Sequence, residues 1–317
     1  MSRILLTAVG SMAAAPAARR YQALGHTVFG CDIYPREWTA LAGELDFFQA
    51  RLATEGEPYV EQLRETVRRN GLDFLIPLTD PEVDALAPRK AEFRALGCTV
   101  CVPEERVAAL CRRKDTMNRF LAEKGACALI PTEAAVPCRP CPFPFPAMVK
   151  PRSGRSSLGQ AVAADEKSYQ TALAGREDCI VQPFLEGDIF CVDVARDAFG
   201  HTRAAARQEL LRNKSGLGMT VEVLPSHPLE AVCAAIAEAV GLVGVVNMEF
   251  IRHGDDFFFL EVNPRFSGGV GFSMAAGMDF AEMMLCCHSC GSVEAFPAAP
   301  KHALLARESQ IILTKQL

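Results

Sequence analysis

Two apolar segments in the last third of the chain each carry a glutamate in their interior. Glu249 lies within VVNMEFI (245–251), and Glu261 lies within FFFLEVN (257–263). Residues two apart in a strand share a face, so Asn263 projects beside Glu261, and a hairpin would bring Glu249 next to both. Two carboxylates and an amide oxygen are hard ligands suited to Mg²⁺. A solvated polar face is the alternative, but an unpaired charge inside an apolar run is costly.

The first hundred residues alternate apolar strand-like runs with helix-length segments. Strands are expected at 4–9, 26–32, 73–78 and 98–102. This alternation is typical of parallel βαβ units in an open, doubly wound α/β sheet. The carboxyl ends of such strands share one rim, which here would carry Gly10, Asp32 and Asp80.

The pattern changes after Pro103. A helix is expected from there to about Lys124, with Lys114 in its middle, followed by longer strands joined by turns. This second part reads as α+β with a largely antiparallel sheet, interrupted by a helix at 228–240 and followed by one from about Asp279. We therefore expect three parts: an N-terminal domain (1–102), a small subdomain (103–180) and a C-terminal subdomain (181–317).

Two further segments are typical of a nucleotide site. KPRSGRSSLG (150–159) lies between two strands, and its glycine and serine residues let backbone and hydroxyl donors approach an oxyanion. A plain hairpin loop is an equally good interpretation of this segment alone. The apolar strand and turn CIVQPFLEGD (179–188) could offer an adenine ring backbone groups and an apolar wall.

In order and spacing these features resemble the ATP-grasp superfamily over nearly the whole chain. FLEVNPRFSGG after VVNMEFI carries most of the resemblance, and the branch it is most similar to is the carbamoyl-phosphate synthetase large chain with its single-unit relatives. The resemblance implies a nucleotide held between two α+β subdomains, behind a preceding α/β domain. It also implies ATP and Mg²⁺ as cofactors, with Mn²⁺ as a substitute.

The resemblance implies roles for individual residues. Glu249, Glu261 and Asn263 correspond to the metal ligands, and Arg265 to an arginine near the transferred phosphoryl group. Lys114 corresponds to a lysine that reaches the α-phosphate region. Lys150 corresponds to the family's second lysine. The loop that closes over the β- and γ-phosphates corresponds to Ser153, Gly154, Ser156, Ser157 and Gly159. The hinge that contacts adenine corresponds to Gln182, Pro183, Phe184 and Leu185. Arg212 and Lys214 resemble a basic pair that stabilises developing phosphoryl charge.

The sequence departs from the family pattern at two positions. Ile189 stands where many relatives have an acidic residue for the ribose hydroxyls, and Asp188 is the neighbour that could substitute for it. Gly10 is a lone glycine where a dinucleotide site would have three. The N-terminal domain is therefore interpreted as a platform for the substrate, not as a cofactor site.

These features predict an ATP- and Mg²⁺-dependent ligase that activates a carboxylate as an acyl phosphate for attack by an amine. Carboxyphosphate chemistry and a non-catalytic ATP-binding regulator are the alternatives. The acyl group is expected near the turn Ser267-Gly268-Gly269. Asp80 and Glu82 could receive an ammonium group, although Asp80 could equally cap the helix that begins at Pro81.

Composition narrows the class of protein further. The formal net charge is −5 and there is no polybasic run, which argues against nucleic acid as a partner. No apolar stretch is long enough for a membrane span, and no secretory signal is evident, so a cytoplasmic location is expected. A homodimer is left open. We expect the cysteines to be reduced thiols. We expect no metal at either of the two cysteine clusters, which are Cys138 with Cys141, and Cys286, Cys287 and Cys290 with His288.

Overall fold

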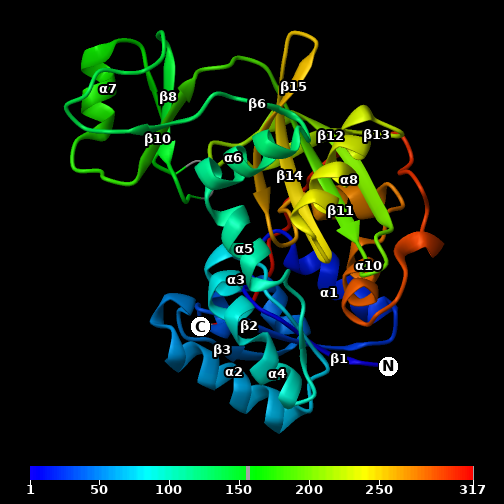
Figure 1. Cartoon of the computed structure of the whole chain (residues 1–317). Coiled ribbons are helices and arrows are strands. Elements are labelled where there is room, and N and C mark those ends of the chain that lie inside the picture. The colour runs from blue at the N-terminus through cyan, green and yellow to red at the C-terminus, as the bar shows by residue number, and fades with distance from the viewer. Residues whose placement is uncertain (155–157, 317) are drawn as a thin grey trace.

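Three β-sheets form the framework of the molecule in the computed structural model, which describes residues 1–154 and 158–316. In Figure 1 the N-terminal domain lies at the bottom, a small sheet with α7 lies at the upper left, and a large sheet lies at the upper right. Helices α5 and α6 run between the domain below and the sheets above. The expected combination of an α/β domain and antiparallel sheets is confirmed.

The N-terminal sheet is parallel, with strand order β3-β2-β1-β4-β5. Its strands are β1 (Arg3–Leu6), β2 (Thr27–Asp32), β3 (Asp46–Gln49), β4 (Phe74–Ile76) and β5 (Thr99–Val100). Its helices are α1 (Ala14–Ala23), α2 (Glu57–Asn70), α3 (Asp80–Leu86) and α4 (Lys90–Ala95). The edge strand β3 is the one that was not anticipated, because it is short and only partly buried.

The small sheet is antiparallel, with strand order β7-β10-β8-β9. It consists of β7 (Glu133–Ala135), β8 (Ala147–Pro151), β9 (Ala161–Ala163) and β10 (Cys179–Pro183), and α7 (Glu166–Leu173) packs on it. Its core includes Ala147, Val149 and Val181. Because side chains alternate along a strand, Met148, Lys150 and Gln182 face the opposite side.

The large sheet has strand order β16-β13-β12-β11-β14-β15-β6, and every pair is antiparallel except β15 with β6. Its strands are β6 (Ala128–Leu129), β11 (Asp188–Arg196), β12 (Thr202–Arg212), β13 (Gly218–Leu224), β14 (Gly244–His253), β15 (Asp256–Asn263) and β16 (Ala303–Ala306). The associated helices are α5 (Glu105–Arg112), α6 (Lys114–Lys124), α8 (Pro228–Val240), α9 (Val270–Ala275) and α10 (Phe280–His288).

The two faces of the large sheet have different partners. Val246, Met248 and Phe250 on β14 belong to a core shared with α5, α6 and α8. Val245, on the other face, belongs to a core shared with α1, α10 and the N-terminal sheet. One apolar core therefore joins the N-terminal domain to the large sheet, and the remainder of that sheet face is left for polar residues.

One part of the expected layout needs correction. The single helix expected from Pro103 to Lys124 is two helices, and Lys114 is the first residue of α6, not a mid-helix residue. Both helices pack on the large sheet, and β6 pairs with β15, so the range 103–180 contributes to two packing units. The division at residue 180 thus stays a proposal about domain limits.

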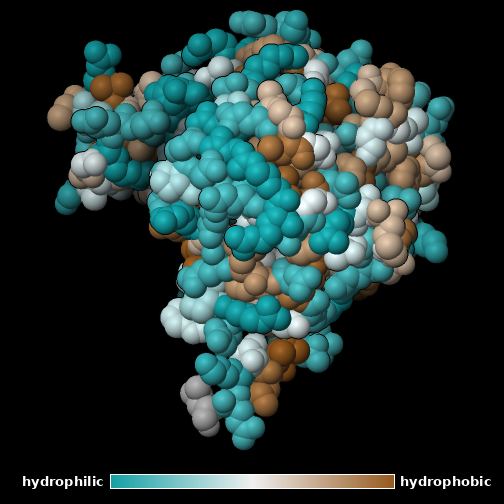
Figure 2. Space-filling model, turned by 90° about the horizontal axis from the view of Figure 1, so that it is seen from below, coloured by the Kyte–Doolittle hydropathy of each residue, from teal (hydrophilic) through white to brown (hydrophobic). Residues whose placement is uncertain are grey.

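The surface is mixed in character. Seen from below, hydrophilic residues cover most of the molecule, and apolar residues appear in small groups (Figure 2). None of the helices in the described ranges has the length and apolarity needed to cross a bilayer. All thirteen cysteines are free thiols.

His288, at the end of α10, generates a prediction about acid stability. Its Nε2 atom is buried without a hydrogen-bond partner in the described structure, and a Cβ on Gly244 (φ +124°) would lie 2.9 Å from it. Burial lowers the pKa of His288 to about 3, with a further contribution from Lys90. The unfolded chain therefore binds a proton below pH ~6.5 that the folded chain does not, and stability falls as the pH drops through that value.

We expect His288→Gln to remove this loss. Between pH 7 and pH 5 the wild type should lose about 1–2 kcal/mol more unfolding free energy than the variant, measured by urea denaturation. The exposed His253 supplies the control variant His253→Gln, which should keep the wild-type pH dependence. Parallel pH curves for wild type and His288→Gln would contradict the prediction.

Candidate active site

A cavity of about 1080 Å³ lies where the three sheets meet. Its wall includes residues from the rim of the N-terminal sheet, from one face of the small sheet and from the polar face of the large sheet. All three expected parts of the chain therefore contribute to one continuous space.

The two glutamates predicted to act together are direct neighbours. Glu249 on β14 pairs in register with Glu261 on β15, and a β-bulge follows this pair. The bulge allows two consecutive residues, Leu260 and Glu261, to line the cavity. Asn263 completes the cluster: its Nδ2 atom donates to Glu249 Oε1 at 3.3 Å and to Glu261 Oε1 at 3.4 Å. The structure thus brings the three residues together on one face.

Cations surround this carboxylate pair. Lys114 Nζ lies 2.9 Å from Glu261 Oε2, and Arg212 Nη2 lies 3.6 Å from Glu249 Oε2. Burial and the neighbouring Glu261 carboxylate raise the pKa of Glu249 to about 7. Burial also acts to raise the pKa of Glu261, but Lys114 and Lys150 outweigh it and lower that pKa. A positive charge beside Glu249 and Glu261 is therefore electrostatically favourable.

Two lysines reach this site from different elements. Lys114 begins α6, and its Nζ also donates to the carbonyl of Gly154 at 3.3 Å. Lys150, on β8 of the small sheet, is 5% exposed and lines the same cavity. Burial lowers the pKa of Lys150 to about 8, and Glu261 partly offsets this shift. Lys114 thus connects the large sheet to the loop that follows β8.

The expected adenine hinge lines the cavity as well. Gln182, Pro183, Phe184 and Leu185 all contribute to its wall. One detail differs from the expectation, because the Phe184 N–H donates to the Pro146 carbonyl at 3.1 Å. The Phe184 carbonyl and the backbone of Leu185 are the hinge groups that remain for a base.

The expected phosphate loop is only partly brought to the cavity. Gly154 lines it, whereas Ser153 and Gly159 do not, and the Gly159 carbonyl accepts from Arg176 Nη2 at 2.7 Å. Ser156 and Ser157 lie outside the described residues.

Arg265 links β15, the strand that carries Glu261 and Asn263, to the N-terminal domain. Its Nε lies 3.3 Å from Asp80 Oδ1, and its Nη2 donates to Asn263 Oδ1 at 3.3 Å. Arg112 Nη1 lies 3.9 Å from the other Asp80 oxygen. Asp80 is thus already neutralised by arginines of the same chain.

The helix cap expected at Asp80 is instead formed by Thr79. Thr79 precedes α3, and the Thr79 backbone N–H and hydroxyl both donate to Glu82 Oε2, at 3.0 and 2.7 Å. Both acidic residues are buried and line the cavity. A role for them in binding an ammonium group stays a prediction.

Two other expected residues are not brought into the site. Lys214 is exposed on the β12–β13 turn and does not contribute to the cavity wall, so only Arg212 of the expected basic pair contacts the carboxylates. Asp188 forms an ion pair with Arg252 instead of lining the cavity, where its neighbour Ile189 lies. The alternation of strand side chains explains this outcome.

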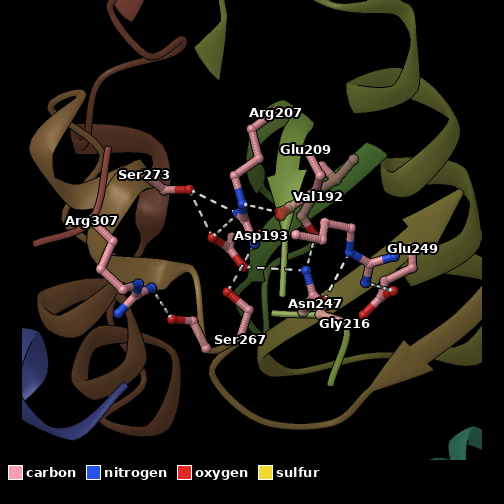
Figure 3. A network of polar contacts seen from close by, with 12 residues as sticks. Val192, Asp193, Arg207, Glu209, Gly216, Asn247, Glu249, Ser267, Ser273 and Arg307 are labelled. Carbon is pink, nitrogen blue, oxygen red and sulfur yellow. Dashed lines mark hydrogen bonds and ion pairs between the residues drawn. The ribbon is translucent and has the colours of Figure 1, made fainter. Parts of the chain in front are cut away.

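A buried charge network beside the site was not predicted. Arg207 on β12 is 1% exposed and forms an ion pair with Asp193 on β11 at 2.6 Å, while its Nε lies 3.2 Å from Glu209 Oε1. Its Nη2 donates to Ser267 Oγ at 3.1 Å, and Ser273 Oγ donates to Asp193 Oδ2 at 2.7 Å (Figure 3). Charged residues inside the apolar runs IFCVDVA and AAARQ carry the same signal that identified Glu249 and Glu261.

This network fixes the turn Ser267-Gly268-Gly269, which lines the cavity. Arg307 holds the turn from the other side by donating to the Gly268 carbonyl at 2.6 Å (Figure 3). A Cβ on Gly269 would lie 2.7 Å from Arg207 Nη2, so only glycine fits there without displacement of the arginine.

The donor set of the cluster fits a hard divalent cation. Mg²⁺ prefers oxygen ligands, and this cluster offers two carboxylates and one amide. Within 1–154 and 158–316, no three residues of the types His, Cys, Asp and Glu are grouped for a metal ion, so this set depends on the amide of Asn263.

Comparisons with known proteins find relatives of this chain. A family model described as "ATP-grasp in the biosynthetic pathway with Ter operon" matches residues 175–310. A formate-dependent phosphoribosylglycinamide formyltransferase from Pseudomonas savastanoi pv. phaseolicola is 26% identical over 231 residues, which cover 64% of this chain and 55% of that protein. The chain therefore spans little more than half the length of this curated relative.

Solved structures share the fold at low sequence identity. Biotin carboxylase from Campylobacter jejuni, crystallised as a β,γ-ATP complex, superposes with a TM-score of 0.78 at 16% identity, covering 96% of this chain and 74% of that one. The L-amino acid ligase from Bacillus licheniformis gives a TM-score of 0.70 at 15% identity, covering 90% and 73%.

A parallel N-terminal sheet and two antiparallel sheets with a cavity between them are the architecture that the chain shares with these solved structures. The chain is an ATP-grasp superfamily protein, as expected from the sequence. Its assignment to the carbamoyl-phosphate synthetase branch stays a prediction.

The Arg207 network generates a prediction about stability. Removal of one partner from a buried ion pair leaves an uncompensated charge, so Arg207→Ala should lower the unfolding free energy by about 3–5 kcal/mol. Arg252→Ala, which breaks the exposed pair with Asp188, should cost about 0–1 kcal/mol. Urea denaturation of both variants measures the two changes in unfolding free energy. Equal decreases would show that the buried network stabilises the fold no more than the exposed ion pair does.

Proposed function

We propose that this chain is an ATP- and Mg²⁺-dependent ligase that converts a carboxylate into an acyl phosphate and joins it to an amine. The observation that carries the proposal is the cluster of Glu249, Glu261 and Asn263, which shares one cavity with Lys114 and Lys150. Negative ligands for a metal and positive groups for phosphates occur together there.

The chemistry needs mainly position and charge. A carboxylate oxygen attacks the γ-phosphorus of ATP, the bond from that phosphorus to the bridging oxygen breaks, and ADP leaves. The amine nitrogen then attacks the acyl carbon, the carbon–oxygen bond to phosphate breaks, and the amine loses a proton. Both steps accumulate negative charge on phosphoryl oxygens, which preorganised cations stabilise.

Each residue of the cluster has a defined part in this proposal. Glu249, Glu261 and Asn263 would hold Mg²⁺, which supplies charge neutralisation for the β- and γ-phosphates when bound. Lys114 would exchange its ion pair with Glu261 for contacts to phosphate. Lys150 would face the same phosphates, and Arg265 the transferred phosphoryl group. The 267–269 turn would border the acyl group.

The alternative of a non-catalytic regulator receives less support from these residues. A regulator that only binds ATP would not need both the metal-type cluster and Arg265 beside it. Chemistry on a phosphorylated substrate, such as that named in the formyltransferase relatives, would need further cations beyond those that face ATP. The L-amino acid ligase shares the fold and agrees in reaction class with the proposal.

Hydroxylamine trapping tests the proposed intermediate. An acyl phosphate reacts with hydroxylamine to give a hydroxamate, so ATP- and Mg²⁺-dependent hydroxamate should form with one or more members of a carboxylate panel. Glu261→Gln should reduce this rate by about 100-fold or more, since metal neutralisation of the phosphates contributes several kcal/mol.

The control for this variant is Glu222→Gln, which changes an acidic residue of β13 outside the cavity wall. It should keep the wild-type rate. Circular dichroism melting should show that Glu261→Gln stays folded. Equal rates for Glu261→Gln and wild type would remove the metal cluster from the proposal.

A further inference from the structure

Large apolar side chains gather on one part of the cavity wall. Five of them, from loops at the carboxyl edge of the N-terminal sheet, line the cavity while remaining exposed, and we name them the apolar shelf: Met12, Ile33, Tyr34, Trp38 and Leu52. Trp38 is 75% exposed and Tyr34 is 53% exposed, and their rings stack with centroids 6.2 Å apart. The shelf is distant in sequence from every residue of the metal-type cluster.

Such a group needs an explanation. Single exposed apolar residues are ordinary, but several that share one concave wall are typical of a ligand-binding site. The cavity, at about 1080 Å³, slightly exceeds the upper end of the roughly 300–1,000 Å³ expected for one small ligand. It therefore has room for a second ligand beside a nucleotide.

Charge limits what that second ligand can be. Of the described wall residues between Ala8 and Glu82, none is basic, and three are acidic: Asp32, Asp80 and Glu82. The Asp32 carboxylate already accepts from the Gly10 N–H at 2.8 Å and from the Tyr34 N–H at 3.2 Å. A phosphate here would meet carboxylates, and the arginine that reaches this end, Arg265, is already paired with Asp80, which is unfavourable in a partly buried site. Lys114 and Arg212 lie at the other end, beside Glu261 and Glu249. The wall arginine Arg207 is paired with Asp193.

We propose that the apolar shelf binds the side chain of an amino acid substrate with a large aliphatic or aromatic group, and that this substrate carries no phosphate. The inference rests on the proposed ligase function for the reaction itself, but binding to the shelf can be measured without ATP. The polar end of the amino acid points toward Arg265 and the 267–269 turn, and its side chain leaves water for the stacked rings of Tyr34 and Trp38.

The chain provides its own reporter for this site. Trp38 is the single tryptophan of the sequence, so intrinsic tryptophan fluorescence reports on the shelf alone. Titration of the full chain with L-leucine or L-phenylalanine should shift the Trp38 emission to shorter wavelength and saturate. Glycine and ribose 5-phosphate at the same concentrations should leave the emission unchanged.

Two variants sharpen the measurement. Leu52→Asp keeps the reporter but puts a charge on the shelf, and it should weaken L-leucine binding by about tenfold or more, the scale expected for lost apolar contacts in a pocket. Phe199→Ala removes an exposed aromatic residue from the β11–β12 turn, outside the cavity, and should bind as the wild type does. Unchanged melting temperatures would show that both variants are folded.

The outcomes separate this inference from the proposed function. No emission change with either apolar amino acid, a response to ribose 5-phosphate, or equal binding by Leu52→Asp and wild type would overturn it. Each of these results is compatible with ATP-dependent hydroxamate formation from another carboxylate. A saturable response to L-leucine that Leu52→Asp weakens would support the shelf even if no hydroxamate formed.

Discussion

The pairing of Glu249 with Glu261 in adjacent strands is the constraint around which the site is built. Two half-buried carboxylates on paired residues repel each other, and partial burial raises the free energy of both charges. The chain answers with Lys114 at 2.9 Å from one carboxylate and Arg212 at 3.6 Å from the other. Burial and the neighbouring Glu261 still raise the pKa of Glu249, so further positive charge beside the pair is favourable. A divalent cation would supply this charge, and the phosphates of ATP would then engage the displaced cations.

The charged groups around the Glu249–Glu261 pair come from all three parts of the fold. The carboxylates come from the large sheet, Lys150 comes from the small sheet, and Asp80 from the N-terminal domain holds Arg265 beside Asn263. Behind the site, the buried pair of Arg207 and Asp193 fixes the turn that would border the acyl group. The cavity thus combines the polar face of the large sheet, Lys150 of the small sheet and the apolar shelf of the N-terminal domain.

Sequence reasoning identified what depends on local pattern. The hairpin that pairs Glu249 with Glu261 followed from two apolar runs and a short turn, and the N-terminal sheet followed from alternating strands and helices. It missed what depends on tertiary packing: the break at Arg113 that makes Lys114 a first helical residue, and the short edge strand β3. Arg207 and Asp193 carried a readable signal, a charge within an apolar strand, but their partnership required the register of β11 with β12.

The most direct test of this account is anomalous diffraction from crystals of the protein grown with Mn²⁺ and ADP. The account predicts an anomalous peak in contact with the carboxylates of Glu249 and Glu261, with Lys114 moved from Glu261 toward the phosphates and the adenine beside Leu185. Nucleotide bound in the cavity with Mn²⁺ elsewhere, and with Lys114 still paired to Glu261, would contradict it.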